Sequence, residues 1–214
     1  ALEVLYSEVA LVDAIYQNAK DAISHLCRDA KTKRSGEQLA DRIITLLLDE
    51  TLEIKPSGNG ADEIRELHRR AARLHERAGR DLDVIKTYER LAKRIGMDDG
   101  VRSSIAAWQR AKKRYPKARE LYAQFEDKID GLIQIASTWL DDGQPAQAIQ
   151  LYDRLAKLEP ERLADWKQAI AEIYSSSGQH DNAIEVYREL ITIAAANAST
   201  WYWTIGSIYE ETKR

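Results

Sequence analysis

The sequence holds little that could cross-link or interrupt a folded chain. One cysteine occurs in 214 residues, so an internal disulfide framework is excluded. Only four prolines and ten glycines are present, and these are the residues that most often end helices and strands. Phenylalanine occurs once, whereas alanine, leucine, glutamate, arginine and lysine are frequent. This composition favours helix along almost the whole chain.

Long apolar runs are scarce too. The longest, IITLLL at residues 43–48, is far shorter than the roughly 20 residues that a membrane-spanning helix needs. No signal peptide is visible. Together with the single cysteine, these absences favour a cytoplasmic location. The chain starts at Ala1 without a methionine, so we expect it to be an excised or processed piece.

Motifs for catalysis or metal binding are also missing from the sequence. It has no phosphate-cradling glycine loop, no HExxH pair and no nucleophile elbow. His68, His75 and Glu76 stand close together, but both histidines occupy places that a repeated pattern gives to aromatic residues. We therefore predict packing rather than metal binding for them. The expectation is a non-catalytic protein without a metal or cofactor.

Charge is present in quantity and is unevenly distributed. The apolar fraction of 44% and charged fraction of 31% are typical of a globular protein, and the net charge is −3. Residues 61–120 carry 17 Lys and Arg against 10 Asp and Glu, so the rest of the chain sums to −10. A basic segment of this kind can attract an acidic partner, or the acidic region of another copy.

A repeated pattern occupies most of the chain. It consists of a glycine, a small residue five places later, a tyrosine four places after that, and a leucine three places further on. The copies are Gly79–Val84–Tyr88–Leu91, Gly143–Ala148–Tyr152–Leu155 and Gly178–Ala183–Tyr187–Leu190. The last two lie 35 residues apart, and the first two leave room for one shortened copy, which we place at residues 101–128.

A second pattern precedes each glycine. A large and a small residue are followed by a ring three places later, as in Ile135-Ala136-x-x-Trp139 and Ile170-Ala171-x-x-Tyr174. The small residue allows close approach of a neighbouring helix, and the ring fills the space beside it. The glycine ends this helix in a conformation that other residues disfavour. Each repeat is thus predicted to be a helix pair that must stack on its neighbours to bury its apolar face.

These patterns resemble the tetratricopeptide repeat (TPR), in which Trp-x-x-Leu-Gly-x-x-Tyr precedes a turn and Ala-x-x-x-Phe and a proline follow it. Residues 202–209 fit the first half, and residues 148–160 fit the second. The tryptophan positions depart from the pattern. Trp166 and Trp201 stand one place early, and His68 and Lys167 occupy positions where the pattern has tryptophan. The resemblance covers about residues 62–214 and implies a right-handed α-solenoid with a concave peptide-binding groove.

The first 54 residues lack the repeat. Apolar residues from Leu5 to Leu26 follow steps of four and three, which predicts a long helix with a coiled-coil-like seam. A second helix is expected over residues 38–52, after the polar KTKRSGEQ, and KPSGNG at residues 55–60 is the clearest linker. The predicted fold is all-α: an N-terminal helical hairpin (1–54) that covers one end of a TPR-like array (62–214). A dimerising coiled coil is the alternative for the hairpin.

Arginines follow one side of the helix expected over residues 62–78, opposite its apolar stripe. The resemblance implies that this side lines the groove, and that two of them stand where chaperone-binding members hold a terminal carboxylate. The candidate partner-binding residues are Arg69, Arg73, Arg77 and Arg70. A solvated surface is the alternative. Basic residues at 110, 112, 113, 114 and 117 extend the positive field, but Asp130 and Gln134 stand where a complete clamp needs basic or amide donors.

The predicted function is a protein–protein interaction scaffold that binds a peptide or partner protein of acidic character. The alternatives are an RNA-binding array similar to pentatricopeptide repeats, or a helical regulatory part of a larger enzyme. A pI of about 5.9 disfavours nucleic acid. Self-association could use the long N-terminal helix or the C-terminal one, where we expect Trp203 and Ile208 to face outward and Tyr202 inward.

Overall fold

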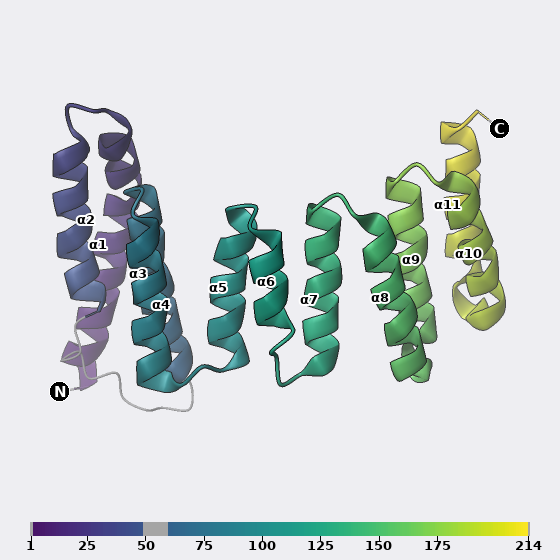
Figure 1. Ribbon diagram of the computed structural model, residues 1–214, viewed down its shortest axis with the longest axis horizontal. Helices are drawn as coiled ribbons and strands as arrows, with labels where there is room; N and C mark the ends of the chain where they lie inside the picture. Colours follow the sequence, from purple (N-terminus) through teal and green to yellow (C-terminus); the bar gives the residue numbers. More distant parts are fainter. Residues whose placement is uncertain (1, 49–59, 214) are drawn as a thin grey trace. The chain divides into compact units, whose positions relative to one another are not determined.

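The structure is a computed structural model that describes residues 2–48 and 60–213 (Figure 1). Those residues form α-helices joined by short turns, with no strand among them, so the predicted all-α class is confirmed. The chain divides into two compact units, residues 1–105 and 106–214, and the division falls inside one helix.

The first unit contains four helices and the beginning of a fifth. They are α1 (Leu2–Arg28), α2 (Lys33–Leu47), α3 (Gly60–Arg77), α4 (Asp81–Ile95) and α5 (Asp99–Ala111). The N-terminal hairpin is present as α1 and α2, which pack on one another and on α3. Their shared core contains Tyr16, Ile23, Ile43, Leu47 and Leu74.

Two details of the hairpin differ from the prediction or lie outside it. KTKRSGEQ, expected to precede the second helix, is itself helical from Lys33 onward. The reason is the buried Gly36, where a Cβ atom would come within 2.7 Å of the Cys27 Sγ, so a glycine lets this turn of helix lie against α1. The seam positions before residue 14 and the linker at 55–59 lie outside the described side chains, and the domain division at residues 54 and 62 stays a prediction.

The second unit contains the end of α5 and six further helices. They are α6 (Tyr115–Tyr122), α7 (Lys128–Asp141), α8 (Pro145–Leu158), α9 (Leu163–Ser176), α10 (His180–Ile193) and α11 (Ala198–Glu211). Single 3-10 turns, Pro160–Arg162 and Ala195–Asn197, lead into α9 and α11. Each helix from α6 to α10 packs on the next one, which is the stacking expected of a helical solenoid.

A left-handed residue closes the first helix of each pair. Gly79, Gly143 and Gly178 have φ of 73°, 70° and 73°, as the pattern predicts. At Gly143 the backbone N–H bonds the Leu140 carbonyl at 3.0 Å, and the next N–H bonds the Trp139 carbonyl at 2.9 Å. These two bonds satisfy carbonyl groups that the helix end would otherwise leave unpaired.

The shortened copy uses a lysine at the same place. Lys113 has φ of 56°, and its N–H bonds the Arg110 carbonyl at 2.8 Å, the same arrangement as at the glycines. Counting from Lys113, the small residue is Ala118, the tyrosine is Tyr122, and the leucine place holds Phe125; all three are buried. Helices α5 and α6 are therefore a complete repeat in the register of the others.

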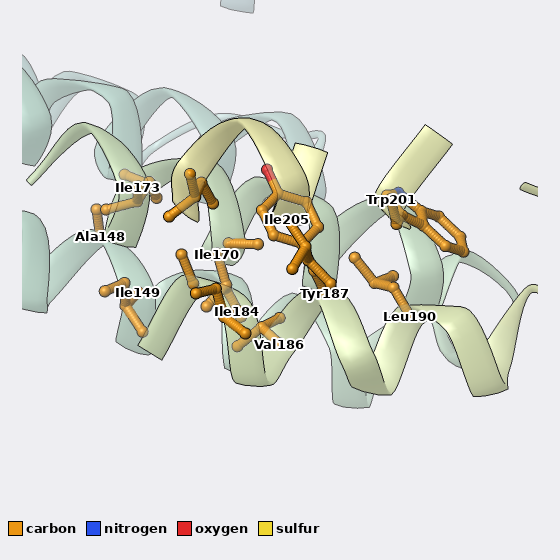
Figure 2. Packing of buried hydrophobic residues seen from close by; sticks show 14 residues of the cluster. Ala148, Ile149, Ile170, Ile173, Ile184, Val186, Tyr187, Leu190, Trp201 and Ile205 are labelled. Carbon is orange, nitrogen blue, oxygen red and sulfur yellow. The ribbon is translucent and has the colours of Figure 1, made fainter. Parts of the chain in front are cut away.

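The repeat residues form the core of the second unit. Figure 2 shows Tyr187 and Leu190 of α10 beside Ile170 of α9 and Trp201 and Ile205 of α11. The predicted burial of the repeat tyrosines and leucines is confirmed, and the least buried of them, Tyr152, packs with its ring centroid 6.1 Å from that of Trp166.

One prediction about α11 is wrong. Trp203 is 74% exposed as expected, but Tyr202 is 63% exposed and Ile208 only 3%. The register of the helix explains why Tyr202 is exposed and Ile208 buried, because Lys213, with φ of 54°, stands where the other first helices have their left-handed residue. Ile208 stands five places before it, as the buried Ile173 does before Gly178, and Tyr202 takes the place of the surface residue Lys167.

Truncation of the repeat leucines should be costly, because each lies fully buried between helices. We expect Leu91→Ala, Leu155→Ala and Leu190→Ala each to lower the free energy of unfolding by about 2–5 kcal/mol in urea titrations. Leu82→Ala is the control, since Leu82 is largely exposed and should change stability little. Similar losses at Leu82 and Leu155 would contradict the assigned register.

Replacement of the left-handed lysine should stabilise the protein. A side chain in this conformation costs about 1–2 kcal/mol that glycine avoids, partly offset by the greater freedom of glycine in the unfolded chain. We expect Lys113→Gly to raise the free energy of unfolding by up to about 1 kcal/mol. Gly143→Lys is the reciprocal control and should lower it. A Lys113→Gly protein that melts earlier than the parent would argue against the strained turn.

Candidate partner-binding site

Helix α3 turns its apolar stripe inward and three of its arginines outward. Ala71, Leu74 and Ala78, which lie along one side, are buried. The helical periodicity then leaves Arg69, Arg73 and Arg77 on the opposite side as a row of residues four apart. The packing of α3 thus decides which side of the helix carries the positive charge.

The Arg69 side chain extends from this row toward α5. Its Nε donates a hydrogen bond to the Ser104 Oγ at 3.1 Å, and its Nη1 lies 3.7 Å from a Glu66 carboxylate oxygen. Ser104 is itself fixed, because its hydroxyl donates to the Gly100 carbonyl at 2.9 Å. The Arg69 side chain remains 39% exposed, so a fixed Nε coexists with accessible terminal nitrogens.

Arg73 is exposed, and its positive charge acts together with that of Arg69 on the hydroxyl of Tyr88. Burial raises the pKa of the Tyr88 hydroxyl, and the positive charges of Arg69 and Arg73 act in the opposite direction. The carboxylates of Glu66 and Glu76 act in the same direction as burial and partly offset them. Arg69 and Arg73 thus stand one turn apart on the same side of α3, and both charges act on a buried tyrosine of α4.

Arg70 and Arg77 lean toward α1 instead. The Arg70 Cζ lies 5.3 Å from the centroid of the Tyr16 ring, and its Nε donates to the Glu66 Oε1 at 3.1 Å. Only 19% of the Arg70 side chain is exposed. The Arg77 Nη1 lies 3.8 Å from an Asp21 carboxylate oxygen. These two arginines help to hold the hairpin against α3.

Arg65 has a structural role that the sequence did not indicate. It donates to the carboxylates of Asp62 and Asp98. Asp98 also accepts from the Val101 backbone N–H at 2.9 Å, so it caps the first turn of α5. A Cβ atom on Gly100 would lie 2.8 Å from the Arg65 Nε, so this glycine allows the arginine to pass.

The second unit uses its arginines in the same way. Arg110 donates from Nε to the Asp141 carboxylate at 2.8 Å and from Nη2 to the Ser137 Oγ at 3.1 Å. Gln134 donates to Asp130 at 3.3 Å, so these two residues bond one another. The positive field expected from Arg110 is therefore neutralised at this point by α7.

The two histidines that invited a metal interpretation are packed residues. His68 is buried, with Nδ1 2.8 Å from the Ile64 carbonyl oxygen. Burial lowers the pKa of His75, and the charge of Arg80 lowers it further. Over residues 2–48 and 60–213, no group of three or more His, Cys, Asp or Glu could hold a metal ion. Within the same ranges, none of the helices has the length and apolar character needed to cross a membrane.

Comparison with known proteins supports the repeat architecture. Residues 167–197, which include α10, match the family model described as tetratricopeptide repeat, and the predicted resemblance is confirmed. None of the curated protein sequences compared with this chain matches it. Repeats of this kind are generally protein-interaction scaffolds, and their fold is generally non-catalytic.

Two solved structures illustrate the similarity. One contains nearly identical TPR-like repeats attributed to a kinesin light chain of Podosopora anserina; it is 14% identical, with 90% of this chain and 96% of that chain covered and a TM-score of 0.49. The other is PilF of Pseudomonas aeruginosa, which is 12% identical, with 91% and 94% covered and a TM-score of 0.40.

The Arg65–Asp98 contact should make stability sensitive to acid. Burial alone would raise the Asp98 pKa, but hydrogen bonds from Arg65 and from backbone N–H groups outweigh it and lower the pKa. A lowered carboxyl pKa contributes stability above the unfolded value of about 3.9, and this stability is lost as pH falls below it. We expect the wild type to keep its advantage over Asp98→Asn from neutral pH to about pH 4 and to lose it progressively at lower pH in urea titrations. Asp62→Asn, which leaves the Asp98 contact in place, should retain most of the acid sensitivity.

Proposed function

We propose that this chain is a non-catalytic interaction scaffold that binds an acidic segment of a partner protein through Arg69 and Arg73 of α3. The observation that carries the proposal is the position of these two arginines one turn apart on the same side of α3, with the Arg69 Nε bonded to Ser104. Both remain accessible from solvent, and one of them is held in place by Ser104. An anchored arginine beside a freer one suits a carboxylate that approaches from outside.

The chemistry of these two side chains and of their neighbours favours a carboxylate over a more extended anion. Arginine can present two parallel N–H donors to a carboxylate, and the Ser104 bond to Arg69 uses Nε and leaves the terminal nitrogens for such a ligand. Glu66 lies 3.7 Å from the Arg69 Nη1, and the charge of Glu76 also opposes those of the arginines at Tyr88, so the net positive field is local, enough for one or two carboxylates. A polyphosphate backbone would need a longer basic surface.

The four arginines identified in the sequence take different parts in this proposal. Arg69 and Arg73 contact the ligand. Arg77 lies at the end of the row and contributes to the field while also facing Asp21. Arg70 is mostly covered and supports the site by holding α3 against Tyr16 of α1.

Charge reversal tests the proposal directly. Arg69→Glu and Arg73→Glu together should weaken the binding of a fluorescently labelled oligoglutamate peptide by at least about tenfold, measured by fluorescence anisotropy. Added salt should reproduce part of the loss, since exposed charges are screened. Arg154→Glu is the matched control, because it makes the same kind of charge change on the exposed side of α8.

Circular dichroism should show unchanged helix content, because neither reversed residue is in the core. Ser104→Ala should weaken binding less than the reversals do, since it frees Arg69 without removing its charge. Equal peptide binding by the parent, the Arg69/Arg73 variant and the Arg154 control would refute the proposed site.

A further inference from the structure

Each second helix exposes one row of residues spaced four apart. The row starts three residues after the left-handed turn residue. In α4 the row is Leu82, Lys86, Arg90 and Arg94, and in α10 it is Asp181, Glu185, Glu189 and Ile193. All eight side chains are exposed, including Leu82 at 73% and Ile193 at 42%. The repeat therefore fixes where these rows face, whatever residues they contain.

The charge in these two rows is not a requirement of the repeat. The equivalent row of α6 contains Pro116 and Glu120, with Gln124 just after the helix, and that of α8 contains Ala146, Gln150, Arg154 and Leu158. Neither accumulates charge of one sign. By contrast, the α4 row has three positive residues after an apolar one, and the α10 row has three negative residues before an apolar one. Solvation of an exposed helix does not demand either arrangement.

We propose that α4 of one molecule packs antiparallel on α10 of a second copy of this chain. Residues four apart rise about 6 Å along any α-helix, so both rows have the same spacing. In antiparallel alignment every position is complementary: Leu82 with Ile193, Lys86 with Glu189, Arg90 with Glu185, and Arg94 with Asp181. Rows of residues four apart are also the ridges that align when two helices cross at about 50°.

The local contacts of these residues are compatible with the pairing. Lys86 donates to Asp83 on its own helix at 3.3 Å, and Lys167 donates to Glu189 at 2.9 Å. Both Lys86 and Glu189 remain more than half exposed, at 72% and 54%. The central residues Arg90 and Glu185 have no ion-pair partner within the described parts of the chain, so the second copy would supply one.

A second copy matches these rows better than an unrelated partner does, because both the charges and the apolar ends complement one another in a single register. A parallel alignment, or a shift by one helical turn, would place apolar residues against charged ones. Exposed ion pairs are individually weak, so the association should be weak and sensitive to salt.

A charge exchange at the central pair tests the proposal. Sedimentation equilibrium over increasing concentration should show self-association of the parent chain, weakened about tenfold by Arg90→Glu and likewise by Glu185→Arg. An equimolar mixture of the two variants should associate as the parent does, because the mixed pair restores both contacts. Arg154→Glu, at the equivalent place of α8, should leave the association unchanged.

Several results would overturn the proposal: a parent chain that stays monomeric at every concentration, variants that associate as the parent does, or a mixture that recovers nothing. The proposal uses no residue of α3, so it is independent of the acidic-peptide site. Arg90→Glu should retain oligoglutamate binding, and the Arg69/Arg73 variant should retain self-association. Circular dichroism and thermal melting of each variant check that the exposed substitutions leave the fold intact.

Discussion

Helices α3, α5, α7 and α9 each end at a residue in the left-handed conformation, and two backbone hydrogen bonds close the chain around it. This turn fixes the direction in which the second helix starts. A small residue then meets the first helix, followed by a tyrosine and a large apolar residue. Because the pair covers only part of its own apolar surface, burial is completed by the next pair. The turn therefore determines which residues of each helix enter the core and which face solvent, and it determines where the arginines lie.

The repeat could be predicted from the sequence wherever a glycine marks this turn. A copy could be placed at residues 101–128, but its register could not be assigned, because a lysine carries no signal for a left-handed conformation. The register follows from the buried Ala118, Tyr122 and Phe125 that come after Lys113. The same difficulty explains α11. Its predicted orientation was taken from the aromatic residues, whereas counting from Lys213 buries Ile208 and exposes Tyr202.

The arginine row of α3 was also predictable, since helical periodicity places it opposite the apolar stripe. Of the residues that contact these arginines, only some could be predicted. Ser104 stands 35 residues after Arg69, one repeat period, and a period places the two residues on successive first helices. That spacing could have predicted the contact. The Tyr16 and Asp21 contacts of Arg70 and Arg77 could not be predicted, because α1 lies outside the repeat and no period relates it to α3.

The uneven charge of the chain has different consequences on the two kinds of helix. On first helices, arginines contact the following repeat. Arg110, for example, donates to Ser137 and Asp141, so its charge is neutralised within the stack of helices. On second helices the exposed row faces solvent in every described repeat, and its central residues in α4 and α10, Arg90 and Glu185, have no ion-pair partner among the described residues. Charge of one sign there contributes little to the fold and repels itself along the helix. Opposite rows on α4 and α10 relieve that repulsion only when they meet, which is why these outer rows, rather than the arginine-rich first helix, point to self-association.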